Sequence, residues 1–120
     1  MLNAKDLLKK AGREDGHYKD SKYVRMACAA AYSGVLLALD EYLHDHPIEP
    51  ATKKKRGRKS VKDYQDALAR LNKKLLDKFR GAYNVLHLDG YYDGIVERKI
   101  IDAGFAVADE IISGIEKHTF

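Results

Sequence analysis

The sequence predicts an all-α protein, an antiparallel up-down four-helix bundle that forms a single domain over residues 1–120. Three observations lead to this fold class. Apolar residues recur at steps of three and four along most of the chain, which is the spacing of one buried helix face. Residues suited to cap helices stand where those patterns begin. No stretch alternates apolar and polar residues between turn signals, so no strand is expected.

The first two helices follow from their caps and their apolar spacing. The first is short, with Asn3 placed to cap it and Gly12 placed to end it. The second begins at Asp20 or Ser21, both good capping residues, and runs to about His44. Its middle is apolar on nearly all sides, which predicts the most buried element of the fold.

Small residues form a stripe on this second helix. Ala30, Gly34 and Ala38 are spaced four apart, so another backbone could approach closely there. The stripe packs within the bundle or forms a seam between two copies of the chain. Cys28 lies among alanines and is expected to be a buried, inert thiol. Because it is the only cysteine, no intrachain disulfide can form.

A basic segment follows the second helix, and residues 45–59 are expected to form a mobile loop. Pro47 and Pro50 prevent a continuous helix here. Removing the six positive charges of the run at 53–59 takes the net charge of the chain from +4 to −2, so the basic character is local. These residues either neutralise phosphates in a salt-sensitive way or form a solvated loop. They are Lys53, Lys54, Lys55, Arg56, Arg58 and Lys59.

The second half of the chain predicts two more helices. The third is expected over 60–88 and opens at Ser60, which has an acidic residue three positions later, as in a capping box. The Asp-Gly pair at 89–90 is a stop signal. A tight connection at 91–94 then leads into the fourth helix, expected over 95–118.

Two tracts of the sequence carry a family resemblance. They are KYVRMACAAAYSGVLLALDEYL at 22–43 and AYNVLHLDGYYDG at 82–94. With the helix order, they resemble a small bacterial family of unknown function that is similar to HEPN domains, the bundles named for higher eukaryotes and prokaryotes nucleotide binding. The resemblance implies a HEPN-like bundle that self-associates as a dimer or a larger homo-oligomer. HEPN-like proteins include toxin ribonucleases, partners of minimal nucleotidyltransferases and members with no known chemistry.

The resemblance also singles out Arg80 and His87. Active HEPN ribonucleases are similar in carrying Arg, four to six residues, then His, and six residues separate the pair here. On a straight helix seven steps turn about 700°, so both side chains would project from nearly one face. Arg would hold a phosphate and His would move a proton. This chain departs from the active proteins in two ways. Gly81 follows the Arg, where they often carry a polar residue, and the pair precedes the last helix rather than opening it. No catalytic site is therefore expected.

Other candidate site residues lie near the expected turn and in the loop. The rings of Tyr83, Tyr91 and Tyr92 could stack on bases, or they could cover the end of the bundle. His44 and His46 flank an acidic residue, but no third strong ligand is defined, so no metal is expected. No phosphate-binding loop or dinucleotide fingerprint is present, and no cofactor is expected.

The leading interpretation is a non-enzymatic binding module for RNA, a nucleotide or a protein partner such as a nucleotidyltransferase. A metal-independent endoribonuclease of toxin type, using Arg80 and His87, is the first alternative. An oligomeric interaction scaffold is the second. A cytoplasmic protein without a membrane segment is expected, because no signal peptide is recognised and the apolar stretch at 26–39 is shorter than the roughly 20 residues that span a bilayer.

Overall fold

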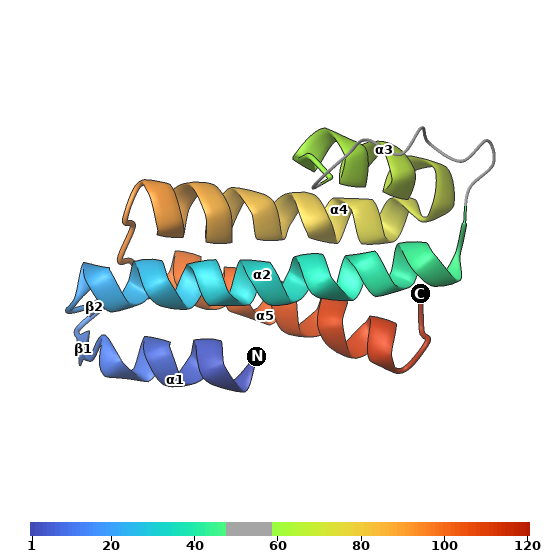
Figure 1. The fold of residues 1–120 in the computed structure, drawn as a ribbon. Coiled ribbons are helices and arrows are strands. Elements are labelled where there is room, and N and C mark those ends of the chain that lie inside the picture. Colours follow the sequence, from blue (N-terminus) through green and yellow to red (C-terminus); the bar gives the residue numbers. More distant parts are fainter. Residues whose placement is uncertain (48–58) are drawn as a thin grey trace.

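The computed structural model describes residues 1–47 and 59–120, and these are mostly helical. Figure 1 shows the elements in chain order: α1 (Leu2–Lys10), β1 (Arg13–Glu14), β2 (His17–Tyr18), α2 (Ser21–Asp45), α3 (Val61–Leu71), α4 (Lys73–Ala82), the π-helix η1 (Tyr83–Tyr92) and α5 (Arg98–Glu116). The helical character agrees with the predicted class, and a small two-stranded sheet is added to it.

Helix α2 is the central element of the fold. It packs against α1, η1 and α5, and Figure 1 shows it running between α1 and α4. Its start is set by Asp20, whose carboxylate accepts a 2.9 Å hydrogen bond from the backbone nitrogen of Lys22. The cap and the bounds of this helix confirm what the sequence predicts. Its buried residues are Val24, Ala27, Cys28, Ala31, Tyr32, Val35, Leu39 and Tyr42.

By length and composition alone, α2 could also cross a membrane. It has 25 residues, and the mean hydropathy of its most apolar 18-residue window is 1.2. The apolar stretch counted from the sequence was shorter than this helix. The core helix of a water-soluble protein satisfies the same criterion.

The hydrophobic core takes most of its residues from α2, α4, η1 and α5, and α1 and α3 each add two. Phe79, Leu86 and Ile111 are fully buried there, and burying a side chain of this size contributes about 1.5–3 kcal/mol. Cys28 is also fully buried, as predicted. Burial raises the pKa of its thiol to about 12, which keeps the sulfur protonated and chemically inert.

The helix expected over 60–88 is divided at Asn72, so the prediction of one continuous helix was wrong. At Asn72 the backbone is extended, with φ −161° and ψ 99°, and the side chain accepts a 3.0 Å hydrogen bond from the nitrogen of Leu75. Asn72 therefore ends α3 and caps α4, and α3 packs against α4 (Figure 1). The apolar spacing continues through the break, which concealed it. The capping box of Ser60 and Asp63 is confirmed.

The second departure from the expected helix is the π-helix η1. The Asp-Gly pair at 89–90 does not stop the chain, which keeps winding to Tyr92. Gly90 is required by a close approach to α2, because a Cβ atom there would lie 2.4 Å from the sulfur of Cys28. The glycine that resembles a stop signal thus serves packing, and the last helix begins at Arg98 rather than near residue 95.

Strands β1 and β2 form a small hairpin, so the expectation of no strand was also wrong. Arg13 pairs with Tyr18 in antiparallel register. A bridge from His17 to Glu97, and a 2.9 Å hydrogen bond from the Tyr18 nitrogen to the Val96 oxygen, join the hairpin to the segment before α5. Strands of two residues are too short to show an alternating pattern.

Helix α1 begins before the residue that was expected to cap it. Helix α1 begins at Leu2, with Met1 in the capping position and no side-chain cap, so the cap predicted at Asn3 was wrong. Most of the predicted mobile loop at 45–59 lies outside the described residues. Helix α2 ends at Asp45, and the description resumes at Lys59.

Candidate functional site

A chain of contacting aromatic rings runs between α2 and the segment formed by α3, α4 and η1. The ring centroids of Tyr64 and Phe79 are 5.8 Å apart. Phe79 in turn lies 6.4 Å from Tyr32 and 6.5 Å from Tyr83. Together with the rings that surround His87, these residues form what we call the aromatic row: Tyr32, Tyr64, Phe79, Tyr83, His87, Tyr91 and Tyr92.

His87, in the middle of η1, contacts four tyrosines of the row. Its ring centroid lies 4.9 Å from Tyr32, 5.3 Å from Tyr83 and 6.1 Å from Tyr91, and all three pairs are stacked. Tyr92 meets it edge-on at 4.9 Å. These separations fall in the range at which aromatic pairs attract each other. The sequence grouped Tyr83, Tyr91 and Tyr92 near the turn, but it did not place Tyr32 of α2 or His87 among them.

Exposure increases along the aromatic row. Phe79 is completely buried, and Tyr64 and Tyr32 are 5% and 8% exposed. Tyr91 and Tyr92 are 43% and 60% exposed. The row therefore starts inside the core and ends at the surface, where the last turn of η1 presents two rings to solvent.

Arg25 of α2 holds this exposed end in place. Its Nη1 donates hydrogen bonds of 2.8 Å to the carbonyl of Tyr91 and 2.9 Å to the carbonyl of Tyr92. The guanidinium also lies against Gly94, which has a φ of +68° and where a Cβ atom would come within 2.4 Å of Nη2. The last carbonyls of a helix lack partners within the helix, so Arg25 satisfies two of them and places a positive charge beside the exposed rings.

The hydroxyl of Tyr32 is a polar atom without a partner inside the row. It is buried and has no hydrogen-bond partner among residues 1–47 and 59–120. Burial raises the pKa of Tyr32 to about 12, with a smaller contribution from Tyr83. A buried hydroxyl left unsatisfied costs about 1–3 kcal/mol. Water or a ligand that entered the row could satisfy it.

Lys59, a residue of the basic segment, lies beside Tyr64 at the buried end of the row. The hydroxyl of Tyr64 donates a 2.8 Å hydrogen bond to Asp40. The Nζ atom of Lys59 lies 3.2 Å from the same carboxylate and 5.8 Å from the centroid of the Tyr64 ring. The other basic candidates lie outside the described residues; they are Lys53, Lys54, Lys55, Arg56 and Arg58.

Arg80 lies apart from His87. It is exposed on α4, and its Nη1 is 4.0 Å from a carboxylate oxygen of Asp77. The described part of the chain shows no contact between Arg80 and His87. The straight helix assumed from the sequence does not exist here, because a π-helix closes its turns with i→i+5 hydrogen bonds and each residue turns the chain by less than the 100° of an α-helix.

No metal-ligand cluster is found in the described part of the chain, where no three His, Cys, Asp or Glu residues could hold an ion together. His46 instead stacks on Tyr42, with the ring centroids 4.3 Å apart. Its Nδ1 lies 2.9 Å from the carbonyl oxygen of Tyr42. These contacts close the end of α2.

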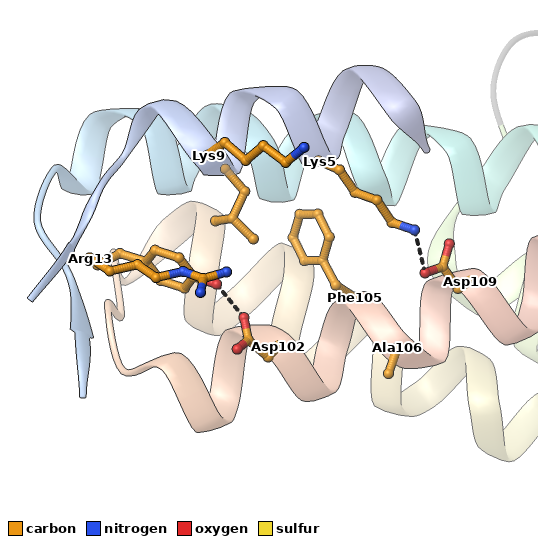
Figure 2. Close-up of a pocket in the computed structure, with 9 residues that line it drawn as sticks. Lys5, Lys9, Arg13, Asp102, Phe105, Ala106 and Asp109 are labelled. Carbon is orange, nitrogen blue, oxygen red and sulfur yellow. Dashed lines mark hydrogen bonds and ion pairs between the residues drawn. The ribbon is translucent and has the colours of Figure 1, made fainter. Parts of the chain in front are cut away.

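A second candidate region is a groove of about 370 Å³ between α1 and α5 (Figure 2). Sequence reasoning missed it, because its walls come from opposite ends of the chain and no motif links them. Its lining residues are Lys5, Leu8, Lys9, Arg13, Tyr18, Asp102, Phe105, Ala106 and Asp109.

Comparisons with known proteins identify relatives of the whole chain. Residues 1–117 match the family model of a domain of unknown function, DUF5618. A solved structure of a protein of unknown function from Dyadobacter fermentans is 42% identical with a TM-score of 0.81, and the match covers 99% of this chain and 88% of that one. No match was found among curated proteins. These findings confirm the expectation of an uncharacterised family, and the chain belongs to the DUF5618 family.

Proposed function

We propose that this protein is a non-enzymatic binding module for RNA or a nucleotide, and that unpaired bases stack on the exposed end of the aromatic row. The observation that carries the proposal is the pair of exposed rings of Tyr91 and Tyr92, held by Arg25 and backed by His87. Stacking of a base on an aromatic side chain contributes about 1–3 kcal/mol and tolerates any base, because every base has a π-face.

Positive charge at both ends of the row supports a nucleic-acid ligand. Arg25 lies beside the exposed rings, and Lys59 lies over Tyr64 at the other end. Five further basic residues precede Lys59 in the sequence. A protein that neutralises phosphates releases counterions from the nucleic acid, so its affinity falls as the salt concentration rises.

The winding of η1 supports a functional role for the same region. π-helical turns are uncommon and occur frequently at functional sites. Here the wide turns place Tyr83, His87, Tyr91 and Tyr92 in one continuous set of ring contacts. The ring of Tyr32 stacks on His87, and its hydroxyl, which has no partner among the described residues, adds a polar group that an entering ligand could use.

The proposal extends to a HEPN-like fold and to self-association. The sequence resemblance to HEPN domains supports nucleotide or RNA binding. On α2, the side chains of Met26 and Leu37 are 42% and 70% exposed, which gives this helix apolar surface that a second copy could cover. Light scattering of the purified protein tests this part, and a strictly monomeric protein at micromolar concentration would contradict it.

Fluorescence anisotropy with a labelled oligouridine tests the proposed ligand. We expect binding that weakens steeply with salt and that falls by about tenfold or more when Tyr91 and Tyr92 are both changed to leucine, since one lost stacking contact already corresponds to about that factor. The matched control is Tyr23→Leu, at a half-buried α2 tyrosine that makes no ring contact with the aromatic row within the described ranges. Equal affinity of the double variant and the parent would remove the row as the site.

Cleavage, oligomeric state and binding by further variants separate the alternatives. RNA cleavage without added metal that requires both Arg80 and His87 would establish the endoribonuclease instead. Absence of binding at low salt, together with a stable oligomer, would favour the interaction scaffold. Loss of binding only when the basic residues at 53–59 become glutamine would move the site from the row to that segment.

A further inference from the structure

The groove between α1 and α5 is separate from the aromatic row, because no residue lines both. Its volume of about 370 Å³ falls within the range of roughly 300–1,000 Å³ that is typical of small-molecule pockets. Leu8, Phe105 and Ala106 give it an apolar lining. Figure 2 shows the Phe105 ring standing in the space between the two helices. This surface fits the apolar body of a ligand.

Basic side chains line the α1 wall of the groove. Lys5 and Lys9 extend from α1, and Arg13 follows at the start of β1 (Figure 2). Lys5 forms a 2.8 Å ion pair with Asp109. The side chain of Lys9 has no ion pair or hydrogen bond within the described residues, and Arg13 has no ion pair there. Two cations of this wall are therefore available to a ligand.

The acidic residues of the groove are already engaged. Asp109 is paired with Lys5, and Asp102 accepts a hydrogen bond from the hydroxyl of Tyr18. Burial and this hydrogen bond raise the pKa of Tyr18 to about 12, and the nearby positive charge of Arg13 opposes the rise only in part. Tyr18 thus stays a neutral donor, and the lining carries three cations against two anions.

We propose that this groove binds a small organic carboxylate with a compact apolar body. The body lies on Leu8 and Phe105, and the carboxylate lies between Lys9 and Arg13. An arginine offers a planar pair of donors that matches both carboxylate oxygens, and a lysine adds a point charge. A ligand made only of phosphate would leave the apolar lining unused, and a cation would face the unpaired charges.

An amide NMR titration of the full chain with naphthoate tests the site, and naphthamide serves as the neutral match. We expect shifts at amides of the residues that line the groove. Naphthoate should bind about threefold to tenfold more tightly than naphthamide, because a hydrogen bond to a charged group is stronger than one to a neutral group. Equal affinities, shifts elsewhere, or no shifts at millimolar ligand would overturn the proposal.

Variants of the basic residues on the α1 side of the groove provide a second test of the proposal. Changing both Lys9 and Arg13 to glutamine should lower the affinity for naphthoate to that for naphthamide and leave naphthamide binding unchanged. Lys10→Gln is the matched control, because Lys10 is exposed on α1 and does not line the groove. Circular dichroism checks that each variant is folded. An unchanged preference for naphthoate in the double variant would contradict the assigned role of these two cations.

Discussion

The imidazole of His87 in η1 stacks on the phenol ring of Tyr32 in α2, with ring centroids 4.9 Å apart and an angle of 29° between the planes. This contact directs His87 into the aromatic row, whereas the ion pair of Arg80 is made with Asp77 on α4. A general base must come within about 3 Å of the proton it moves, directly or through one water. The described geometry does not bring an Arg80-bound phosphate to His87.

We therefore predict no metal-independent ribonuclease activity. Purified protein incubated with mixed RNA should leave it uncut, as should His87→Ala and Arg80→Ala. Cleavage by the parent that both substitutions abolish, with circular dichroism unchanged, would falsify the binding-module proposal and establish the endoribonuclease. Cleavage that survives both substitutions would indicate another site or a contaminant.

The hydrogen bond from Tyr64 to Asp40 predicts a measurable contribution to stability. It joins α3 to α2 at 2.8 Å, and the ring of Tyr64 is 5% exposed. Tyr64→Phe keeps the ring and removes the donor, so we expect the free energy of unfolding to fall by about 0.5–1.5 kcal/mol in urea denaturation. Tyr92→Phe, at an exposed ring, is the matched control and should change it by less. Equal effects would show that the hydrogen bond contributes nothing to stability.

Alanine substitutions at two helical glycines should change the stability of the fold in opposite directions. At Gly90 a Cβ atom would lie 2.4 Å from the sulfur of Cys28, so Gly90→Ala should destabilise the fold by about 1–3 kcal/mol. At Gly81 nothing lies within 4 Å, so Gly81→Ala should stabilise the helix by up to about 1 kcal/mol. Thermal melting measures both, and Cys28→Ala should partly restore Gly90→Ala. A Gly90→Ala protein as stable as the parent would refute the close packing of η1 on α2.

The stripe of small residues on α2 should tolerate alanine but not leucine. A Cβ atom at Gly34 would lie 3.4 Å from Cδ1 of Ile112 on α5, an ordinary contact, so Gly34→Ala should be accepted. Gly34→Leu should destabilise by about 1–3 kcal/mol through overpacking. Melting temperature and light scattering are the measurements. A folded Gly34→Leu protein with a changed oligomeric state would assign the stripe to a subunit seam.

Alkaline pH should weaken the fold in a defined window. In an unfolded chain tyrosine has a pKa of about 10, whereas burial and the Asp102 hydrogen bond raise the pKa of Tyr18 to about 12. Between these values the unfolded state has lost a proton that the folded state retains, so the contribution of Tyr18 to stability is constant below the window and is lost as the pH rises through it. Urea midpoints across the window measure the loss of stability, which should be smaller in Tyr18→Phe. A loss of stability of the same size in Tyr18→Phe would show that other titrating groups cause it.

Local signals predicted much of the fold. Asp20 and Ser60 carry capping side chains and begin helices as expected, because a cap acts within three residues of its own position. The break at Asn72 was missed because Leu68, Leu71 and Leu75 keep helical spacing across it. The amide cap at Asn72 is the one local signal that could have revealed it.

The candidate sites were less predictable, because tertiary packing creates them. The sequence brought Tyr83, Tyr91 and Tyr92 together, since they are close along the chain. The contact of Tyr32 with His87 depends on how η1 lies against α2, which no local pattern encodes. The groove depends on the placement of α1 against α5, and its charged residues look like ordinary solvated helix surface in the sequence.

The position of α3 has a consequence for how the domain can open. Helix α3 packs on the outside of α4 (Figure 1), and two of its 11 residues, Tyr64 and Leu68, are buried. The Tyr64 hydroxyl links it to Asp40 of α2. Segments with few buried contacts open at a lower free energy than the whole molecule. The amides of α3 should exchange with deuterium long before those of α2 and α5, and their opening would uncover the buried end of the aromatic row. We therefore expect α3 to be a segment in which this domain loses structure while α2 and α5 stay folded.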